Sequence, residues 1–223
     1  MTIAHHPTDE TLLRYAAGTL AAGPAIVIAA HLAVCPLCRN RLRTFEALGG
    51  AVLDETPATA LAPTALAAAL TRIDAEAAPA PSGRHAGPSA ARPSPVTRDG
   101  LRLPDALAGC DIGAWRWLGP GVRMSRISTP REPDASIMLL KVAPGRKLPE
   151  HGHSGTEFTH VLSGSFSDVL GRFGPGDLAE VDDEVEHQPI VDRDGECICL
   201  VALDGRMRLS GLFGRIVQPL FGF

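Results

Sequence analysis

The sequence predicts a multidomain α + β protein in which a small four-helix domain precedes an all-β, jelly-roll-like barrel. Three differences in composition support this fold class. Residues 1–78 are rich in Ala and Leu with helical spacing, and residues 101–223 are rich in Val, Ile and Leu in short runs between turn signals. Residues 79–100 are mostly Pro, Ala, Ser and Gly. They have almost nothing apolar to bury, so they predict a flexible linker between the two domains.

Cap and breaker residues divide the first segment into helices. Thr8 suits the N-cap of the first helix and Gly18 its end, while Pro24 suits the first turn of the second. Pro36 favours a break after the second helix. The expected helices cover residues 8–17, 25–34, 39–53 and 63–76. A domain this small often needs a staple such as a bound metal ion.

Turn signals such as Pro144-Gly145 and Asp194-Gly195 divide the second segment into strands. Many short strands at regular spacing are typical of a sandwich or barrel. The expected strands cover residues 114–118, 122–127, 136–142, 157–162, 165–170, 178–181, 187–191 and 197–203. The apolar tail 212–223 is too short to span a bilayer and is expected to pack on the barrel.

Composition excludes several classes of function. Hydrophobic residues make up 45% of the 223 residues and charged residues 21%, which is close to globular averages. The net charge of −4 gives no general attraction to nucleic acid, so direct DNA binding is not expected. The sequence has no run long enough for a transmembrane helix and no secretory signal, which predicts a cytoplasmic protein without membrane contact. In that reducing compartment the five cysteines are more typical of metal ligands or redox thiols than of disulfides.

Metal-ligand side chains are concentrated near the N-terminus. His31, Cys35 and Cys38 form a His-x3-Cys-x2-Cys pattern. Residues four apart share a helix face, so His31 and Cys35 point the same way, and Cys38 returns from the following turn. A structural Zn²⁺ site needs four nitrogen or sulfur ligands, and His5 and His6 are the only other histidines before the linker. A Cys-x-x-Cys redox pair with an unrelated histidine is the alternative interpretation.

This pattern resembles the signature of the zinc-binding anti-sigma family. The resemblance implies that His6, just before the first helix, is the fourth zinc ligand beside His31, Cys35 and Cys38, with His5 as the alternative. It also implies that residues 1–78 hold an extracytoplasmic-function (ECF) sigma factor in a one-to-one complex.

A second ligand pattern lies in the predicted barrel. Gly145, five residues, His151-Gly152-His153, three residues, Glu157, six residues and Gly164 follow one another as in the first motif of cupin barrels. The three ligands all have odd positions. Side chains alternate along a strand, so these three are expected to share a face and converge on one ion.

His187 is the expected fourth ligand of the barrel. The second cupin motif is usually Pro-x-Gly, two residues and His, whereas this chain has residues 174–177 (Gly-Pro-Gly-Asp) and then His only at position 187. His160 has the opposite parity and is expected to point away. Three imidazoles and a carboxylate suit Zn, Fe, Mn or Ni, and Zn²⁺ is the ion we expect.

The two patterns and the linker together resemble the ChrR group of anti-sigma factors over nearly the whole chain. The resemblance implies a regulator that is not an enzyme and that releases its sigma factor under oxidative stress such as singlet oxygen, sensed through the cupin domain. A metal-dependent cupin dioxygenase with a zinc-binding accessory domain is the alternative, and a thiol redox protein using Cys35 and Cys38 is a third reading. Cys197 and Cys199 should face the same side of one strand, either as small buried hydrophobes or as a redox sensor. Cys110 has no assigned role.

Overall fold

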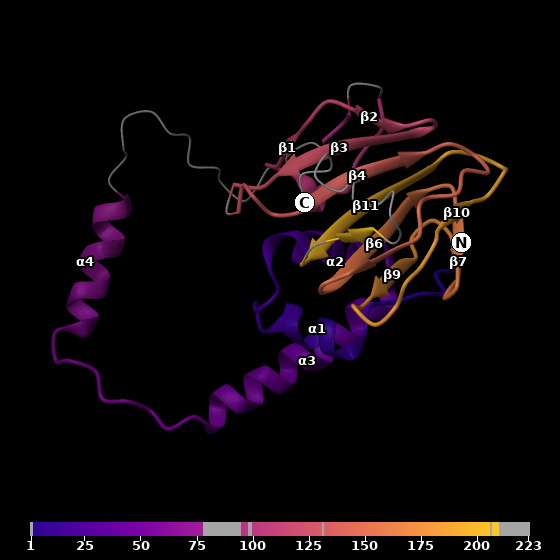
Figure 1. Ribbon diagram of the computed structural model, residues 1–223. Helices are drawn as coiled ribbons and strands as arrows, with labels where there is room; N and C mark the ends of the chain where they lie inside the picture. The colour runs from indigo at the N-terminus through magenta and orange to yellow at the C-terminus, as the bar shows by residue number, and fades with distance from the viewer. Residues whose placement is uncertain (1, 78–94, 98–99, 131, 206, 210–223) are drawn as a thin grey trace.

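The structure, a computed structural model, describes residues 2–77, 95–97, 100–130, 132–205 and 207–209. Most of the predicted linker and the tail 212–223 lie outside these residues. Four α-helices come first, followed by a β-sheet domain, as the sequence predicts (Figure 1). The helices are α1 (Asp9–Ala16), α2 (Ala22–Val34), α3 (Pro36–Glu55) and α4 (Ala65–Ala77).

The helix ends follow from local chemistry. The Thr8 hydroxyl accepts a hydrogen bond from the Thr11 amide at 3.2 Å and caps α1. The chain breaks at Cys35, as Pro36 predicted, but α3 begins at Pro36 itself rather than at residue 39. Proline at the first helical position lacks only a donor that would be unpaired anyway, so the next helix begins at once. The short break places the end of α2 beside the start of α3.

The four helices do not form a bundle. Helix α4 lies apart from the rest of the protein (Figure 1), and its apolar residues at helical spacing are exposed, by 72% at Leu66, 52% at Leu70 and 61% at Ile73. The core of the helical part is instead built from α1, α2 and the start of α3 together with one face of the main sheet. The helical residues therefore share a core with the barrel across the predicted domain boundary.

All eight predicted strands are present, β9 with the predicted bounds and the other seven with shifted ends, and four short strands are added. The main sheet has the order β1-β3-β4-β11-β6-β9, with β2 paired to β3, and smaller sheets have the orders β10-β7-β8 and β12-β5. The strands are β1 (Asp111–Ile112), β2 (Arg116–Gly119), β3 (Val122–Ser128), β4 (Ile137–Val142), β5 (His151–His153), β6 (Thr156–Ser163), β7 (Phe166–Asp168), β8 (Gly171–Phe173), β9 (Leu178–Val181), β10 (Ile190–Val191), β11 (Cys197–Asp204) and β12 (Met207–Leu209).

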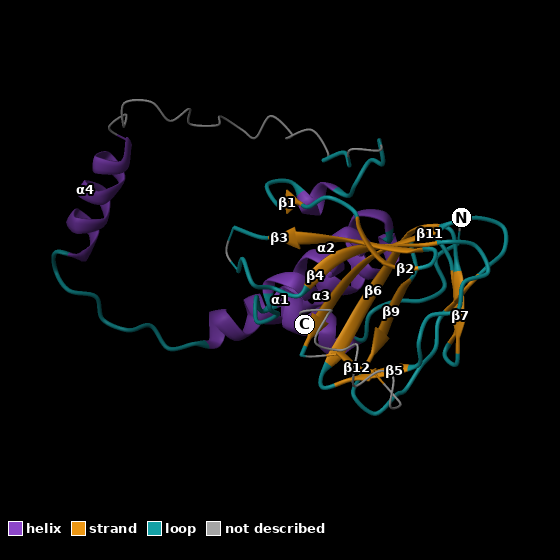
Figure 2. Cartoon of the chain, turned by 45° about the horizontal axis from the view of Figure 1, so that its top comes forward, coloured by secondary structure: helices purple, strands orange, loops and turns teal. Residues whose placement is uncertain are grey.

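Alternation along the central strands produces two separate cores. Met138, Val161 and Val201 face the barrel interior. Their neighbours Leu139, Phe158 and Leu200 face outward and share a core with Val27 and Ile28 of α2. Helix α2 thus covers the outer face of β6 and β11 (Figure 2).

Among the described residues, no single helix has the length and apolar composition needed to cross a membrane. Helices α2 and α3 meet the length and composition criteria only when taken together, and they are bent by 119° at the break between them.

Candidate metal centres

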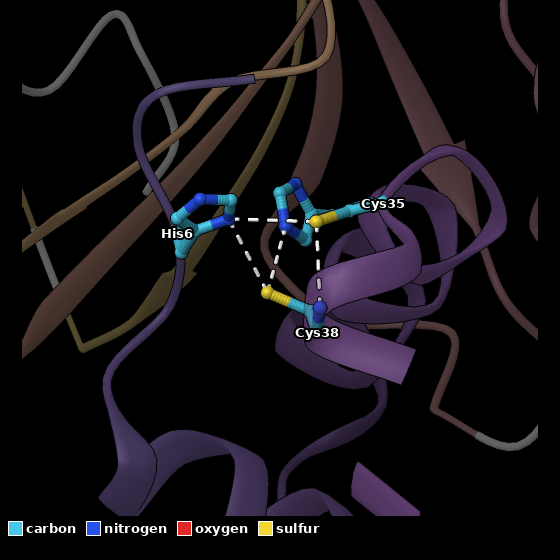
Figure 3. Close-up of side chains that lie close together, drawn as sticks. His6, Cys35 and Cys38 are labelled. Atoms are coloured by element: carbon cyan, nitrogen blue, oxygen red, sulfur yellow. Dashed lines mark hydrogen bonds between the residues drawn. The ribbon is translucent and has the colours of Figure 1, made fainter. Parts of the chain in front are cut away.

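The structure brings His6, His31, Cys35 and Cys38 together. Figure 3 shows His6 facing the side chains of Cys35 and Cys38. His31 lies in the last turn of α2, Cys35 at the break and Cys38 in the first turn of α3. His6 Nδ1 lies 3.4 Å from each of the two sulfurs, and His31 Nε2 lies 3.3 Å from Cys38 Sγ. A tetrahedral zinc site separates its nitrogen and sulfur ligands by about 3.5 Å. The four side chains therefore fit one ion of that kind.

In the helical cluster, burial favours the neutral form of the His31 imidazole and the protonated form of the Cys38 thiol. Burial lowers the pKa of His31 to about 4, and the nearby His160 adds to the shift. Burial also raises the pKa of Cys38 to about 12, with further contributions from the hydrogen bond and charge of Cys35. A divalent cation reverses this preference, because a coordinated thiol loses its proton.

The structure separates the two candidate N-terminal histidines. His6 points into the cluster, whereas His5 lies against the barrel. The Nε2–H of His5 can donate to the carbonyl of Arg172 at 3.1 Å, and its ring packs on Phe173 at 4.2 Å between centroids. The geometry therefore favours His6, the expected ligand, over His5, the alternative.

The barrel contributes a hydrogen bond to the helical cluster. His31 Nδ1 lies 2.9 Å from the backbone carbonyl of Gly176, which precedes β9. If Nδ1–H donates to this carbonyl, Nε2 remains free to bind an ion. Partners of this kind orient histidine ligands in metal sites.

The second cluster contains all four barrel residues predicted from the sequence, each of them buried. His187 Nε2 lies 3.2 Å from His151 Nε2 and 3.3 Å from His153 Nε2. The carboxylate of Glu157 lies 3.7 to 3.9 Å from the three Nε2 atoms. In tetrahedral zinc sites, nitrogen ligands are about 3.3 Å apart, so the four side chains fit one ion.

Backbone pairing with His151 places His187 in the cluster, although His187 does not lie in a strand. It precedes β10 and forms an antiparallel bridge with His151, in which each residue's amide donates to the other's carbonyl. This pairing places the two rings side by side although the residues are far apart in the sequence. It compensates for the late position of His187 relative to the usual motif.

Other polar groups orient the barrel ligands. His187 Nδ1 lies 2.9 Å from a carboxylate oxygen of Asp168, and the Thr159 hydroxyl donates to Glu157 at 3.0 Å. His151 Nδ1 lies 2.9 Å from the carbonyl of Pro149. Within the described part of the chain, only His153 Nδ1 is a buried side-chain polar atom without a hydrogen-bond partner. The imidazoles of His151 and His187 are thus held with Nε2 towards the shared centre.

The barrel cluster keeps its carboxylate charged. Burial by itself raises the pKa of Glu157. The hydrogen bond and charge of His151, with the charges of His153 and His187, outweigh burial and lower this pKa to about 2. An anionic oxygen among three imidazoles is a donor set that binds divalent transition metals.

An apolar cavity of about 330 Å³ lies inside the barrel beside this cluster, and His151 and Glu157 form part of its wall. Cys197 and Cys199 also line it, on the same side of β11 as predicted, with their sulfurs 3.6 Å apart. The hydrogen bond from Cys197 and burial raise the pKa of Cys199 well above its ordinary value. A protonated thiol is a poor nucleophile, which favours the role of buried hydrophobe.

His160 points away from the barrel cluster, as its parity predicted. Its ring meets that of His31 edge to face at 5.7 Å between centroids, and its Nδ1 lies 3.1 Å from the carbonyl of Asp177. The side chains that support the two clusters, such as Asp168 and Asp177, were not identified from the sequence. No spacing marks them, because they meet the ligands only through tertiary packing.

Comparisons with known proteins cover both parts of the chain. The family model described as ChrR Cupin-like domain matches residues 105–205. Over 99% of both chains, the sequence is 41% identical to the anti-sigma-E factor ChrR of Cereibacter sphaeroides. The structure is similar to a crystal structure of Rhodobacter sphaeroides SigE in complex with the anti-sigma ChrR, with a TM-score of 0.68 and 36% identity over 91% of this chain and 100% of that chain. The similarity therefore includes the helices as well as the barrel.

Proposed function

The chain belongs to the ChrR family of anti-sigma factors, and from this membership we propose that it binds and inhibits one ECF sigma factor in a one-to-one complex. The similarity over 99% of both chains carries the proposal, because a match to the barrel alone would imply nothing about a sigma factor. Inhibition consists of keeping the sigma factor from RNA polymerase, without catalysis and without direct DNA contact. The protein must then share the cytoplasm with the polymerase.

The helical part offers an apolar surface for the sigma factor. Large exposed hydrophobic side chains line the second half of α3 and continue along α4, at Leu48, Val52, Leu53, Leu66, Leu70 and Ile73. Nothing in the described chain covers α4 (Figure 1). Exposed apolar surfaces of this extent mark interaction sites in soluble proteins. We assign sigma-factor binding to residues 1–78, which the linker 79–100 joins to the cupin domain 101–223.

We further propose that both clusters hold metal ions. In the helical site, Zn²⁺ bound by His6, His31, Cys35 and Cys38 would staple the N-terminal segment to α2 and α3. Two cysteines and two histidines form a closed set with no position for a substrate, as in structural zinc sites. In the barrel, His151, His153, Glu157 and His187 would hold a divalent ion, with Zn²⁺ as the first expectation.

The barrel is the proposed sensor of oxidative stress. Its apolar cavity is lined by His151 and Glu157, two of the four ligands, so a small oxidant such as singlet oxygen that enters the cavity would reach the coordination. A change there can release the sigma factor only if it alters the free energy of holding it. Weakening the complex about a hundredfold requires a coupling of about 2.7 kcal/mol, within the usual allosteric range.

The same cavity favours one alternative, a metal-dependent dioxygenase. An apolar pocket beside an ion is also what a small-molecule enzyme requires. The two functions predict different measurements. An enzyme must turn over a substrate with the barrel ion present, whereas an anti-sigma factor must inhibit transcription stoichiometrically.

Transcription from a sigma-dependent promoter tests the proposal, with purified polymerase and an ECF sigma factor from the same organism. The full chain should repress transcription at a one-to-one ratio, and a generator of singlet oxygen should relieve the repression. His151→Ala should still repress but should no longer respond to the oxidant, while Glu184→Ala on the exposed barrel surface should behave as wild type. A full chain that fails to repress at any ratio contradicts the anti-sigma role.

The fragment 1–78 tests which part of the chain binds the sigma factor. If the helical part alone holds the sigma factor, the fragment should repress with and without oxidant. Failure of a folded fragment to repress would mean that the barrel helps to form the sigma-binding surface. A fragment that responds to oxidant would place the sensor in the helical metal site.

A further inference from the structure

We propose that the cupin barrel clamps the N-terminal segment and so positions two of the four ligands of the helical metal site. Asp177, Gly176 and Glu180 would be the positioning residues. This inference rests on the helical site binding a metal, as proposed above. It goes further in making that site a product of both domains rather than of residues 1–78 alone.

His6 is held by anchors on both sides. Before it, the amides of Ala4 and His5 donate to one carboxylate oxygen of Asp177, at 2.7 and 3.0 Å. The carbonyl of His5 also accepts from the amide of Leu178 at 3.2 Å, so the segment runs beside the start of β9. These contacts fix the backbone immediately before the ligand.

The anchors after His6 converge on Glu180. The amide and the hydroxyl of Thr8 donate to the two carboxylate oxygens of Glu180, at 2.8 and 2.9 Å. The hydroxyl of Thr11 donates to the same carboxylate at 2.7 Å. Glu180 lies in β9, so a barrel strand holds the chain on the far side of His6 as well.

The barrel also holds the second histidine. The carbonyl of Gly176 lies 2.9 Å from His31 Nδ1, in the turn that Asp177 closes by accepting the amide of Gly174. Gly176 has φ +92°, and a Cβ there would lie 2.9 Å from Ile3. The residue that presents the carbonyl therefore has to be glycine, both for its backbone conformation and for its contact with the N-terminal segment.

The helical residues alone do not supply these anchors. His6 precedes α1, so no intrahelical hydrogen bond fixes its backbone. If metal binding alone had to order this segment, the conformational entropy lost by its residues would oppose binding. Because the barrel fixes it beforehand, metal binding need not order it, and the release of metal becomes slower.

Metal release from the full chain tests the clamp. Co²⁺ replaces Zn²⁺, because a thiolate-to-cobalt charge-transfer band reports only the cluster that contains cysteine, while the barrel cluster contains none. Asp177→Ala should accelerate transfer of cobalt to a chelator about tenfold, the lower end of the range for supporting groups of metal ligands. Asp177→Asn keeps an oxygen that can accept from Ala4 and His5, and should restore most of the wild-type rate.

Asp182→Ala is the matched control. It removes another barrel carboxylate that accepts a backbone hydrogen bond, from the amide of Glu184, and that is not one of the anchors of the N-terminal segment. It should release cobalt at the wild-type rate. If Asp177→Ala does not fold, Glu180→Ala takes its place, because it removes the anchors of Thr8 and Thr11 at the other end of the segment.

The outcomes separate the clamp from the site itself. A folded Asp177→Ala or Glu180→Ala variant that releases cobalt at the wild-type rate overturns the clamp and leaves the helical site intact. A wild-type chain without a thiolate-to-cobalt band overturns the helical metal site and the clamp with it. Inhibition of transcription is measured independently, so neither result is confused with failure of the anti-sigma role.

Discussion

Replacing Phe158 by alanine tests whether the helical part and the barrel unfold together. Phe158 lies in β6, is only 1% exposed and belongs to the core that the sheet shares with α2. Truncating a fully buried phenylalanine to alanine removes its transfer free energy and leaves a cavity, at a cost of about 3–5 kcal/mol. One kcal/mol shifts the melting temperature of a chain of this size by roughly 2–4 °C. We therefore expect the melting temperature to fall by roughly 6–20 °C.

Aromatic probes in the two parts allow each to be followed separately. Tyr15, the only tyrosine of the chain, lies in α1, and the two tryptophans, Trp115 and Trp117, lie at the start of the barrel. Near-ultraviolet circular dichroism in excess zinc, which keeps metal loading constant, should show both signals moving together in Phe158→Ala. Val169→Ala, at a side chain 72% exposed, should leave both unchanged.

Separate transitions would refute this reasoning. If the tryptophan signal shifts and the Tyr15 signal does not, residues 1–78 fold independently and their contacts with the sheet contribute little. If neither signal shifts by more than the control, Phe158 is not part of a cooperative core.

Three further outcomes are expected. Glu157→Gln removes the only anionic donor of the barrel cluster, so a chelator should remove the barrel ion at least about tenfold faster than from the wild type. Glu184→Gln, at the exposed surface, should retain the ion as the wild type does. Equal retention in the two variants contradicts the ligand assignment. Leu70→Glu places a charge on the exposed apolar face of α4 and should weaken sigma-factor inhibition by about tenfold or more in a titration of the transcription assay, whereas unchanged inhibition would remove α4 from the sigma-binding surface. The folded-state pKa of His31 is lowered to about 4, so its contribution to stability is present above the unfolded-state value of about 6.5 and is lost as the pH falls towards 4. Urea unfolding of the metal-free chain should therefore show stability declining over that range, with a smaller slope in His31→Gln; an identical slope would mean that His31 is not buried as a neutral imidazole.

Three ligands of each set were predictable from the residues because they depend on short-range geometry, whereas His6 was expected only from the family resemblance. His31, Cys35 and Cys38 meet through one helix end and one tight turn, so their spacing predicts their position. His151, His153 and Glu157 lie close together in the sequence and share parity. Proline and turn signals likewise placed every main strand and all four helices, although Pro36 begins α3 rather than merely separating two helices.

The remaining features depend on tertiary contacts that sequence patterns do not encode. His187 reaches the cluster through its bridge with His151, which depends on the path of the barrel loops. The apolar stripe of α4 predicts burial in a bundle, yet it is exposed, since the pattern indicates only that a helix has an apolar face and not which molecule covers it. The anchors Asp177 and Glu180 are ordinary acidic residues of a barrel strand and its preceding turn until the N-terminal segment meets them.

Strand β6 connects the two clusters directly. Glu157 faces the barrel ion site, and three residues later His160 faces the opposite side, against His31 and the Asp177 carbonyl. The strand is paired along its length with β11 and from Glu157 to His160 with β9, so a shift of Glu157 cannot be absorbed by a loose loop. Such a shift would move the edge on which the clamp and His31 rest. Coupling between sites is reciprocal, so a barrel that loosens the sigma factor when its coordination changes must bind its own ion differently when the sigma factor is held. On this reasoning the two candidate metal clusters lie against opposite faces of one sheet, and the sheet would couple the proposed sensor to the proposed sigma-binding part.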